Sequence, residues 1–310
     1  MKAYIVFDDF LPDSVRELEN AGISVTVHKK GQARPNRCEM KRILEQFDIA
    51  IIGTGQKIDE EMWENITTCR IIGSASVGID HIKVPDNKKH LLTVVNTPTA
   101  NARSVAEYVL GVMLMFRKRL LEGNDLYYVG ADNKKLIRKP EDLYGTTVGL
   151  IGAGHISIMV MDMLKPFGTK ILCHTKHPSR HMDLMERFNV EFVALPELIK
   201  MSDIISVNVA FDSSTTNLIS NKLVAVMKEN CIFISISRPQ VVDIEALLRK
   251  GELNPNFYIC LDIDVIPKYA GKNNNRNIIF TPHIAGGTIE TRKRMFMEVT
   301  KGILKTCCMM

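Results

Sequence analysis

A glycine-rich turn stands between an apolar, strand-like run and a helix-like run in the segment TTVGLIGAGHIS. Gly152 permits a tight turn, and Gly154 lets a pyrophosphate approach the backbone. The helix that starts at His155 and Ile156 offers free N–H groups and the positive end of its dipole. Ser157 replaces the third glycine of this fingerprint and is still small. The pattern predicts a dinucleotide site; the alternative is a glycine turn that binds nothing.

A basic cluster follows the next strand, where a dinucleotide-binding unit usually carries an acid. The run KILCHTKHPSR contains, at and after the strand end, Thr175, Lys176, His177 and Arg180. An acid at this place would accept hydrogen bonds from a ribose 2′-hydroxyl and repel a 2′-phosphate. Basic side chains instead attract a phosphate through charge-assisted hydrogen bonds. The cluster predicts NADP(H) as the preferred cofactor, with NAD(H) as the second choice; the other interpretation is a solvated basic turn without selectivity.

Short β-branched runs alternate with amphipathic helical patterns along the whole chain. Examples are AYIVFDD, DIAIIG and RIIGSA in the first third, and KILCHT, DIISVNV and CIFISIS later. This βαβ rhythm predicts an α/β fold with parallel sheets in two lobes, Rossmann-like or flavodoxin-like. We expect a lobe formed by residues 1–96 together with a terminal helix in residues 285–310. Residues 97–284 form the second, dinucleotide-binding lobe.

The composition is that of an ordinary globular protein. The 310 residues are 45% hydrophobic and 24% charged, with a formal charge of +5 spread along the sequence. A nucleic-acid-binding protein would more often concentrate its basic residues, so we expect no nucleic-acid partner. No apolar run reaches the ~18 residues of a membrane span, and the start MKAYIVFDDF lacks a secretory signal. Seven cysteines without CxxC pairing indicate reduced thiols, and we expect a cytoplasmic protein without a metal site.

Several segments together resemble one enzyme family. They are SASVGIDHI, NTPTANARSVAEYVLGVML, GLIGAGHIS, FISISRPQVVD, LDI and TPHIAGGT. In this order they resemble the D-isomer-specific 2-hydroxyacid dehydrogenases, and SVGIDH, LKPFG and ISR are most similar to the glyoxylate/hydroxypyruvate reductase branch. The resemblance implies an active site in a cleft between two lobes, the first of which binds substrate. It also implies a homodimer that transfers a hydride between a nicotinamide and a small anionic 2-keto or 2-hydroxy acid.

The resemblance assigns roles to residues of both lobes. Val77 and Gly78 match the loop whose backbone N–H groups hold the substrate carboxylate. Arg238 matches the arginine that binds carboxylate and keto oxygen, a task suited to a planar, permanently charged fork. His283 matches the proton donor, because an imidazole titrates near neutral pH.

Three further positions match residues that line the cofactor. Asp262 matches an acid that contacts the nicotinamide carboxamide. Ala210 and Ile236 match positions that contact the cofactor largely through their backbone.

The family pattern breaks near the expected catalytic histidine. A glutamate that pairs with the histidine lies in the family five residues after the position of Asp262, and this chain has Pro267 there. Asp264 is the nearest acid, but two residues along a strand is the wrong register unless the loop bends. Asp264 is therefore the candidate substitute partner. Without any carboxylate the pKa of His283 would fall and reduction at neutral pH would slow.

Three functions remain open from the sequence. The first is an NADPH-dependent reductase of glyoxylate, hydroxypyruvate or a specialised biosynthetic analogue. The second is a dinucleotide-sensing binding protein of the co-repressor kind, which the missing glutamate favours and Arg238 with His283 opposes. The third is formate or phosphite oxidation on the same scaffold, which would need different loops.

Overall fold

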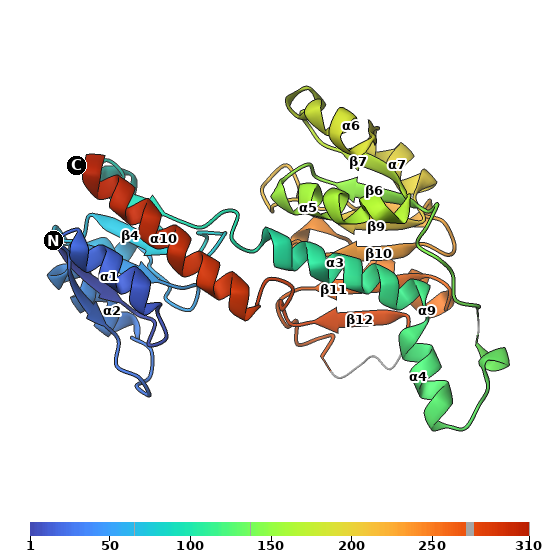
Figure 1. Ribbon diagram of the computed structural model, residues 1–310, viewed down its shortest axis with the longest axis horizontal. Helices are drawn as coiled ribbons and strands as arrows, with labels where there is room; N and C mark the ends of the chain where they lie inside the picture. Colours follow the sequence, from blue (N-terminus) through green and yellow to red (C-terminus); the bar gives the residue numbers. More distant parts are fainter. Residues whose placement is uncertain (65, 137, 271–275, 310) are drawn as a thin grey trace. The chain divides into compact units, whose positions relative to one another are not determined.

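The computed structural model describes residues 1–64, 66–136, 138–270 and 276–309, and the chain forms two compact units (Figure 1). Unit 1 contains Met1–Asn101 and Thr288–Met310, and unit 2 contains Ala102–Gly287. The boundaries that the sequence suggested, at 96/97 and 284/285, lie a few residues earlier. Each unit is built around its own parallel sheet, as the alternation of strand and helix patterns predicted.

The sheet of unit 1 has five strands in the order β2-β1-β3-β4-β5. Its strands are β1 Lys2–Ile5, β2 Ser24–Val27, β3 Ile49–Ile52, β4 Ile71–Ser74 and β5 Thr93–Val95. The helices are α1 Pro12–Asn20, α2 Arg37–Gln46 and α10 Ile289–Met309, with 3₁₀ turns at Glu60–Trp63 and Asp86–Lys88. All four strand pairs are parallel, and this order is that of flavodoxin-like sheets.

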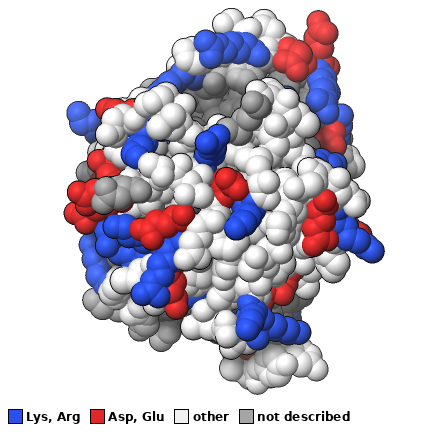
Figure 2. All heavy atoms as spheres, turned by 90° about the vertical axis from the view of Figure 1, so that its left-hand side faces the viewer, with Lys and Arg blue, Asp and Glu red and all other residues white. Residues whose placement is uncertain are grey.

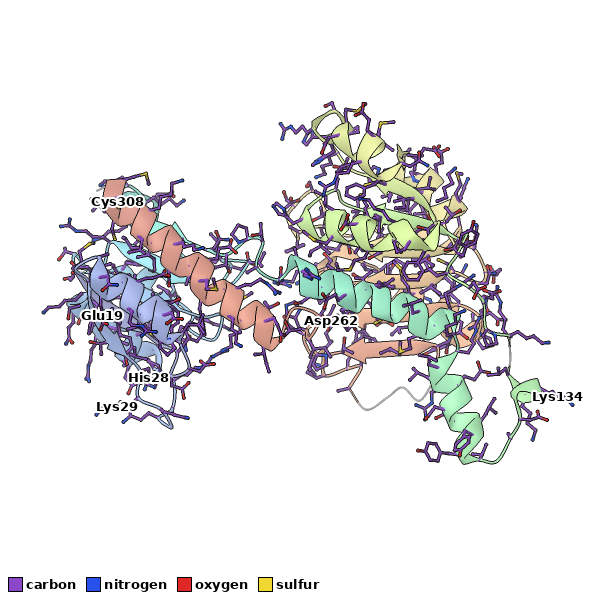
Figure 3. The ribbon with its side chains drawn as sticks, in the orientation of Figure 1. Glu19, His28, Lys29, Lys134, Asp262 and Cys308 are labelled. Atoms are coloured by element: carbon purple, nitrogen blue, oxygen red, sulfur yellow. The ribbon has the colours of Figure 1, made fainter. Side chains whose placement is uncertain are left out.

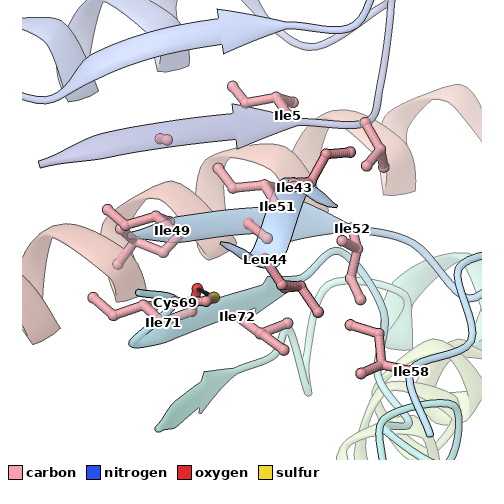
Figure 4. Close-up of a cluster of buried hydrophobic side chains, with 14 of the residues drawn as sticks. Ile5, Ile43, Leu44, Ile49, Ile51, Ile52, Ile58, Cys69, Ile71 and Ile72 are labelled. Atoms are coloured by element: carbon pink, nitrogen blue, oxygen red, sulfur yellow. Dashed lines mark hydrogen bonds between the residues drawn. The ribbon is translucent and has the colours of Figure 1, made fainter. Parts of the chain in front are cut away.

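Helix α10, the last of the described chain, completes the core of unit 1. Phe296 is buried, and its ring lies 5.0 Å from that of Phe7 and 4.5 Å from that of Phe10, measured between centroids. A Cβ at Gly73 on β4 would lie 2.7 Å from a side-chain carbon of Ile303, so glycine lets this helix lie close to the sheet. Figure 4 shows the isoleucine-rich cluster on the strands of this unit, with Ile5, Ile51 and their neighbours side by side.

The sheet of unit 2 has seven parallel strands in the order β12-β11-β10-β9-β6-β7-β8. Its strands are β6 Thr147–Ile151, β7 Lys170–His174, β8 Val190–Phe192, β9 Ile204–Val207, β10 Ile232–Ser235, β11 Tyr258–Asp262 and β12 Ile278–Thr281. The α-helices are α3 Ala102–Arg117, α4 Leu120–Tyr128, α5 His155–Leu164, α6 Asp183–Phe188, α7 Leu195–Met201, α8 Asn221–Ala225 and α9 Ile244–Leu253. The 3₁₀ turns are η3 Asn133–Lys135, η4 Lys165–Phe167, η5 Pro178–His181 and η6 Pro239–Val241. Counted from β6, the order continues the 3-2-1-4-5-6 arrangement of a dinucleotide-binding sheet by one strand.

Helices cover both faces of this second sheet. One buried cluster joins α3, α5 and α6 to the strands, and another joins α7, α8 and α9 to them. Successive residues of a strand contribute to opposite clusters, as Leu150 and Ile151 do on β6. Strands buried on both faces explain why the sequence shows continuous apolar runs rather than alternation.

Helices α3 and α4 are separate, because the chain turns at Arg119 between them. Arg119 has a left-handed backbone with φ 54°, and its buried guanidinium lies 4.4 Å from the ring centroid of Tyr258. This cation–π contact with a strand far along the chain favours the turn. Burial lowers the pKa of Arg119, so the aromatic contact offsets part of the cost of enclosing its charge.

The cysteines are free thiols, and the surface charges of both signs are mixed, as the composition suggested (Figure 2). Burial raises the pKa of Cys69, Cys173, Cys231 and Cys260 to about 12, which keeps these free thiols unreactive. Basic and acidic side chains are interspersed on the face of the molecule drawn in Figure 2. Among the described residues, no helix combines the length and the apolar character needed to cross a bilayer.

Replacing Phe296 by alanine should destabilise unit 1 by about 3–5 kcal/mol, because a large cavity would open between α10 and the rings of Phe7 and Phe10. Urea unfolding followed by circular dichroism measures the loss. Met297→Ala, at the exposed neighbouring position, is the matched control and should change stability by less than about 0.5 kcal/mol. Equal effects of the two variants would contradict the packing described for α10.

Candidate active site

The glycine turn joins β6 to α5 with a backbone that requires its first glycine. Gly152 has φ 102°, and a Cβ there would lie 3.0 Å from Val209 and 3.2 Å from the carbonyl oxygen of Asn208. Its N–H donates to the carbonyl of His174 on the neighbouring strand, 2.8 Å away. Both the backbone angle and the close approach of β9's continuation therefore exclude a side chain at this position.

The N-terminus of α5 is open above this turn. Gly154 is the N-cap and provides no side chain, and a Cβ there would meet no described atom within 4 Å. His155, the first helical residue, is exposed, whereas Ile156 packs partly into the core. Free N–H groups at an uncapped helix start, beside open space, fit a pyrophosphate.

Ser157 fits at the position of the third glycine because its small side chain is buried and hydrogen-bonded. Its side chain is fully buried, and its hydroxyl oxygen accepts a hydrogen bond of 3.1 Å from the Asn208 amide. The Asn208 side chain in turn accepts from Ser206 at 2.9 Å. This contact ties α5 to the end of β9. The motif gave no sign of it, because Asn208 lies 51 residues further along the chain.

The basic cluster after β7 has a neighbour that the sequence did not indicate. Thr175 is half-buried, and the side chains of Lys176, His177 and Arg180 are exposed. Lys176 hydrogen-bonds the Ser214 hydroxyl, which donates to the carboxylate of Asp212.

An acid therefore stands close to the proposed phosphate site. The bonds from Ser214, together with the Lys176 charge, lower the pKa of Asp212 and keep it ionised. Within the described chain, His177 and Arg180 have no ion-pair partner. These two side chains remain available to an anion, whereas the Lys176 charge is shared with Asp212.

Arg238 follows the end of β10, at the same edge of the sheet as the glycine turn. It is half-buried with extended backbone, and its side chain has no hydrogen-bond or ion-pair partner among the described residues. Ser237 beside it donates to the carbonyl of Val209 at 2.6 Å, which fixes this loop against the continuation of β9. Ile236 is half-buried, and Ala210 is exposed with its carbonyl accepting from Thr215 at 2.9 Å.

Asp262, the last residue of β11, is labelled in Figure 3. It holds the loop that contains His283. Its carboxylate is buried and accepts hydrogen bonds from the N–H groups of Ile284 at 2.8 Å and Ala285 at 2.9 Å. It accepts a third, of 2.6 Å, from the Thr281 hydroxyl. Between these anchors His283 adopts a left-handed backbone with φ 53°, a conformation that costs energy outside glycine. Asp262 thereby sets the direction of the exposed His283 side chain.

The Asp262 carboxylate ends a chain of hydroxyl and thiol groups. A carboxylate accepts only, so Thr281 donates to Asp262 and Tyr108 must donate to Thr281, at 2.6 Å. Cys260 then donates its thiol hydrogen to the Tyr108 oxygen, 3.2 Å away. Burial raises the pKa of Tyr108, so the phenol keeps the proton that it donates to Thr281. Tyr108 lies on α3, and its part in the site was not evident from the sequence.

The substitute partner suggested for His283 is not engaged in this structure. Asp264 is exposed, and no hydrogen bond or ion pair between described residues joins it to His283. The chain around Pro267 turns instead toward α9, where Tyr269 donates to Glu245 at 2.6 Å. The pairing of Asp264 with His283 therefore stays a prediction.

The loop after β4 in unit 1 contains the residues suggested for carboxylate binding. Val77 is exposed and Gly78 is half-buried. The carbonyl of Val77 accepts from the Asn96 amide at 2.6 Å, and that of Gly78 accepts from the Ser76 hydroxyl at 2.7 Å. The N–H groups of Val77 and Gly78 have no partner within the described ranges.

The chemical groups of unit 2 fit a nicotinamide dinucleotide. The open glycine cradle suits a diphosphate, and the loops after β9, β10, β11 and β12 end at the same edge. No group of three histidine, cysteine or acidic side chains able to hold a metal occurs in the part of the chain that the structure describes. Fold and site together define a dinucleotide-dependent oxidoreductase.

Comparisons with known proteins agree. Residues 110–285 match the model of the D-isomer specific 2-hydroxyacid dehydrogenase NAD binding domain. The chain is 31% identical to a glyoxylate reductase of Thermofilum pendens, covering 87% of this chain and 81% of the relative. It is 30% identical to a hydroxypyruvate reductase of Thermotoga maritima, covering 86% and 87%. A D-lactate dehydrogenase of Aquifex aeolicus, solved with NAD and lactic acid, superposes with a TM-score of 0.76 at 25% identity, covering 100% and 96%.

The chain belongs to the D-isomer-specific 2-hydroxyacid dehydrogenase family, as its motifs suggested. It is an enzyme of the NAD(P)-dependent D-2-hydroxyacid dehydrogenase kind.

Replacing Asp262 by asparagine should lower the stability of unit 2 by about 1–3 kcal/mol, because an amide cannot accept from Thr281 and both backbone N–H groups as a carboxylate does. The urea midpoint measures this loss. Asp264→Asn, two residues away and exposed, is the control and should leave the midpoint unchanged. A stable Asp262→Asn variant would show that the three hydrogen bonds do not hold the His283 loop.

Proposed function

We propose that the protein is an NADPH-dependent reductase of a small 2-keto acid, related to glyoxylate or hydroxypyruvate or a specialised analogue. The observation that carries this proposal is the placement of Arg238 and His283 after β10 and β12, on either side of Asp262. Neighbouring strands lie about 4.8 Å apart, so the ends of β10 and β12, with β11 between them, are separated by two spacings, roughly 10 Å. Side chains of these lengths can meet on one small acid.

The chemistry divides among three groups of this chain. The nicotinamide, when bound, exchanges a hydride with the substrate carbon. Arg238 binds the substrate carboxylate and keto oxygen through its planar fork, which has no competing partner among the described residues. His283 gives a proton to the oxygen of the reduced carbon. Asp262 keeps the His283 backbone in the orientation that points the imidazole outward.

The cofactor preference rests on the charges beyond β7. His177 and Arg180 are unpaired among the described residues, and they would contact a 2′-phosphate together with Lys176. Asp212 opposes this preference, because its carboxylate lies next to Lys176 by way of Ser214. NADP(H) is therefore the proposed cofactor, with NAD(H) accepted less well.

The substrate class follows from the site and from the relatives. A permanently charged arginine favours an anionic substrate. The names of the two relatives, a glyoxylate reductase and a hydroxypyruvate reductase, state small 2-keto acids as their substrates. In this proposal, residues 1–96 with 285–310 bind substrate and residues 97–284 bind the dinucleotide. The free N–H groups at Val77 and Gly78 would receive the substrate carboxylate.

Helix α4 supports the proposal of a homodimer. It exposes a cluster of large side chains: Leu120, Tyr127, Tyr128 and, directly after the helix, Val129. Tyr127 and Tyr128 are each 79% exposed, although aromatic surface of this kind is usually covered. A second copy of unit 2 would cover it.

The cysteines support a cytoplasmic location. They are free and mostly buried thiols, as expected of a protein in a reducing compartment.

A second function, a dinucleotide sensor without turnover, is favoured by one observation. The His283 ring has no carboxylate partner among the described residues, so the acid that pairs with this histidine in the family pattern is missing.

Turnover with a panel of keto acids distinguishes reductase from sensor. NADPH oxidation should be seen with glyoxylate or hydroxypyruvate, and it should fall at least 100-fold in Arg238→Lys and His283→Gln, because each variant removes a group used in the transition state. NADPH binding, measured by fluorescence, is the control and should persist in both variants. Tight cofactor binding with no turnover of any acid would favour the sensor.

The cofactor preference is tested by three charge changes. Lys176→Ala and Arg180→Ala should each raise the KM for NADPH about tenfold and leave that for NADH within twofold, because a charged hydrogen bond to the phosphate is lost. Asp212→Asn should lower the KM for NADPH. Equal losses with both cofactors in the first two variants would show that the 2′-phosphate does not bind there.

A further inference from the structure

Four hydrogen-bonding groups form a chain beneath the loop that follows β4. The Ser76 hydroxyl donates to the carbonyl of Gly78 at 2.7 Å and lies 2.6 Å from the Ser74 hydroxyl. The Ser74 hydroxyl lies 3.1 Å from Nε2 of His81. Both serines are buried and His81 is half-buried, so these groups depend on one another for hydrogen bonds.

Counting hydrogens fixes the direction of this chain. A hydroxyl has one hydrogen to donate, and Ser76 uses its own on the carbonyl of Gly78. The bond between the serines must therefore be donated by Ser74. Ser74 then has no hydrogen left for His81, so Nε2 of His81 must carry a hydrogen and donate it. The imidazole starts a one-way relay that ends at the backbone.

The environment of His81 favours a neutral ring. Burial lowers the pKa of His81, and the carboxylate of its sequence neighbour Asp80 opposes the shift. The backbone on both sides is fixed, because the His81 carbonyl accepts from the N–H of Ile58 at 2.8 Å and Lys83 donates to the carbonyl of Ile58 at 2.7 Å. The ring is thus held by backbone pairing as well as by Ser74.

The relay anchors one of three successive carbonyl groups. The carbonyl of Ser76 accepts from the N–H of Thr97 at 3.0 Å, that of Val77 from the Asn96 amide at 2.6 Å, and that of Gly78 from Ser76. In a trans peptide the N–H points opposite to the carbonyl. The N–H groups of Val77, Gly78 and Ile79 therefore point away from their anchors.

These three N–H groups have no partner in the described part of the chain. Successive free backbone N–H groups bind anions, because their partial positive charges are already oriented and cost no reorganisation. The groups that bond the carbonyls, namely the Thr97 N–H, the Asn96 amide and the Ser76 hydroxyl, stabilise that orientation from the opposite side of each peptide. They leave the N–H side open to an anion.

We propose that His81, Ser74, Ser76 and Asn96 are positioning residues that orient the loop's N–H groups toward the substrate carboxylate. The inference rests on the proposed function and adds Ile79 to the groups that receive the carboxylate. Val77, Gly78 and Ile79 bind through the backbone. Ser76 and Asn96 hold the anchored carbonyls, and His81 and Ser74 act through Ser76.

Oxamate, a keto-acid analogue that is not reduced, probes the carboxylate site by titration calorimetry on the NADPH-bound protein. Ser76→Ala and Asn96→Ala should each weaken oxamate binding about tenfold, because one anchored peptide becomes free to rotate. In turnover, the KM for the keto acid should rise similarly and kcat should stay within twofold. Should Ser76→Ala fail to fold, Asn96→Ala on the half-buried neighbouring strand end provides the same test.

His81 is tested with a matched pair of variants. His81→Gln keeps a nitrogen donor for Ser74 and should bind oxamate nearly as the parent does, whereas His81→Leu should bind it more weakly, close to the level of Ser76→Ala. His90→Leu, at an exposed position in the same unit, is the control and should change nothing. Nitrogen-15 NMR of the imidazole should show the hydrogen on Nε2 of His81.

The outcomes separate this inference from the proposed reductase. Oxamate binding that depends on Ser76 and Asn96, without turnover of any keto acid, would support the relay and reject the reductase. Unchanged oxamate affinity in those variants, an absence of oxamate binding, or a hydrogen on Nδ1 alone would overturn the relay even if the enzyme reduces keto acids.

Discussion

The constraint on which the site depends is that every strand of each sheet runs in the same direction. The carboxyl ends of seven strands in unit 2 therefore meet at one edge, and the residues placed there come from positions far apart in the sequence. The glycine turn follows β6, Arg238 follows β10, Asp262 ends β11 and His283 follows β12. The same rule puts the Val77 loop after β4 in unit 1. Within each unit, strand register and helix packing hold the bases of these loops in place.

Most of the architecture could be predicted from local sequence. Strands such as β3 and β10 are continuous apolar runs because both faces are covered, and a glycine turn between strand and helix is recognisable from a few residues. The break at Arg119 could not be predicted, because it depends on the ring of Tyr258, more than a hundred residues further on. Local propensity continues the helix, and a tertiary contact overrides it.

Less of the site could be predicted, because many of its contacts join residues that are distant in the sequence. The phosphate cradle is local, and the family motifs indicate Arg238 and His283 in single short segments. The groups that contact other site residues come from distant elements: Asp212 reaches Lys176 through Ser214, and Tyr108 on α3 reaches Asp262 through Thr281. Such contacts have no periodicity or spacing, so only the folded chain reveals them. They determine which group donates each hydrogen bond and which charged side chain already has a partner of opposite charge.

The discontinuity of unit 1 has a consequence for biosynthesis. Its sheet is complete by Val95, but Phe296, Val299 and Ile303 of α10, which fill its core, are added only after the whole of unit 2. The rings of Phe7 and Phe10 must wait, without their aromatic partner, until unit 2 has been translated in full. Domains usually fold in order from the N-terminus during synthesis. Here unit 2 can complete its fold first, while unit 1 still lacks the helix that fills its core.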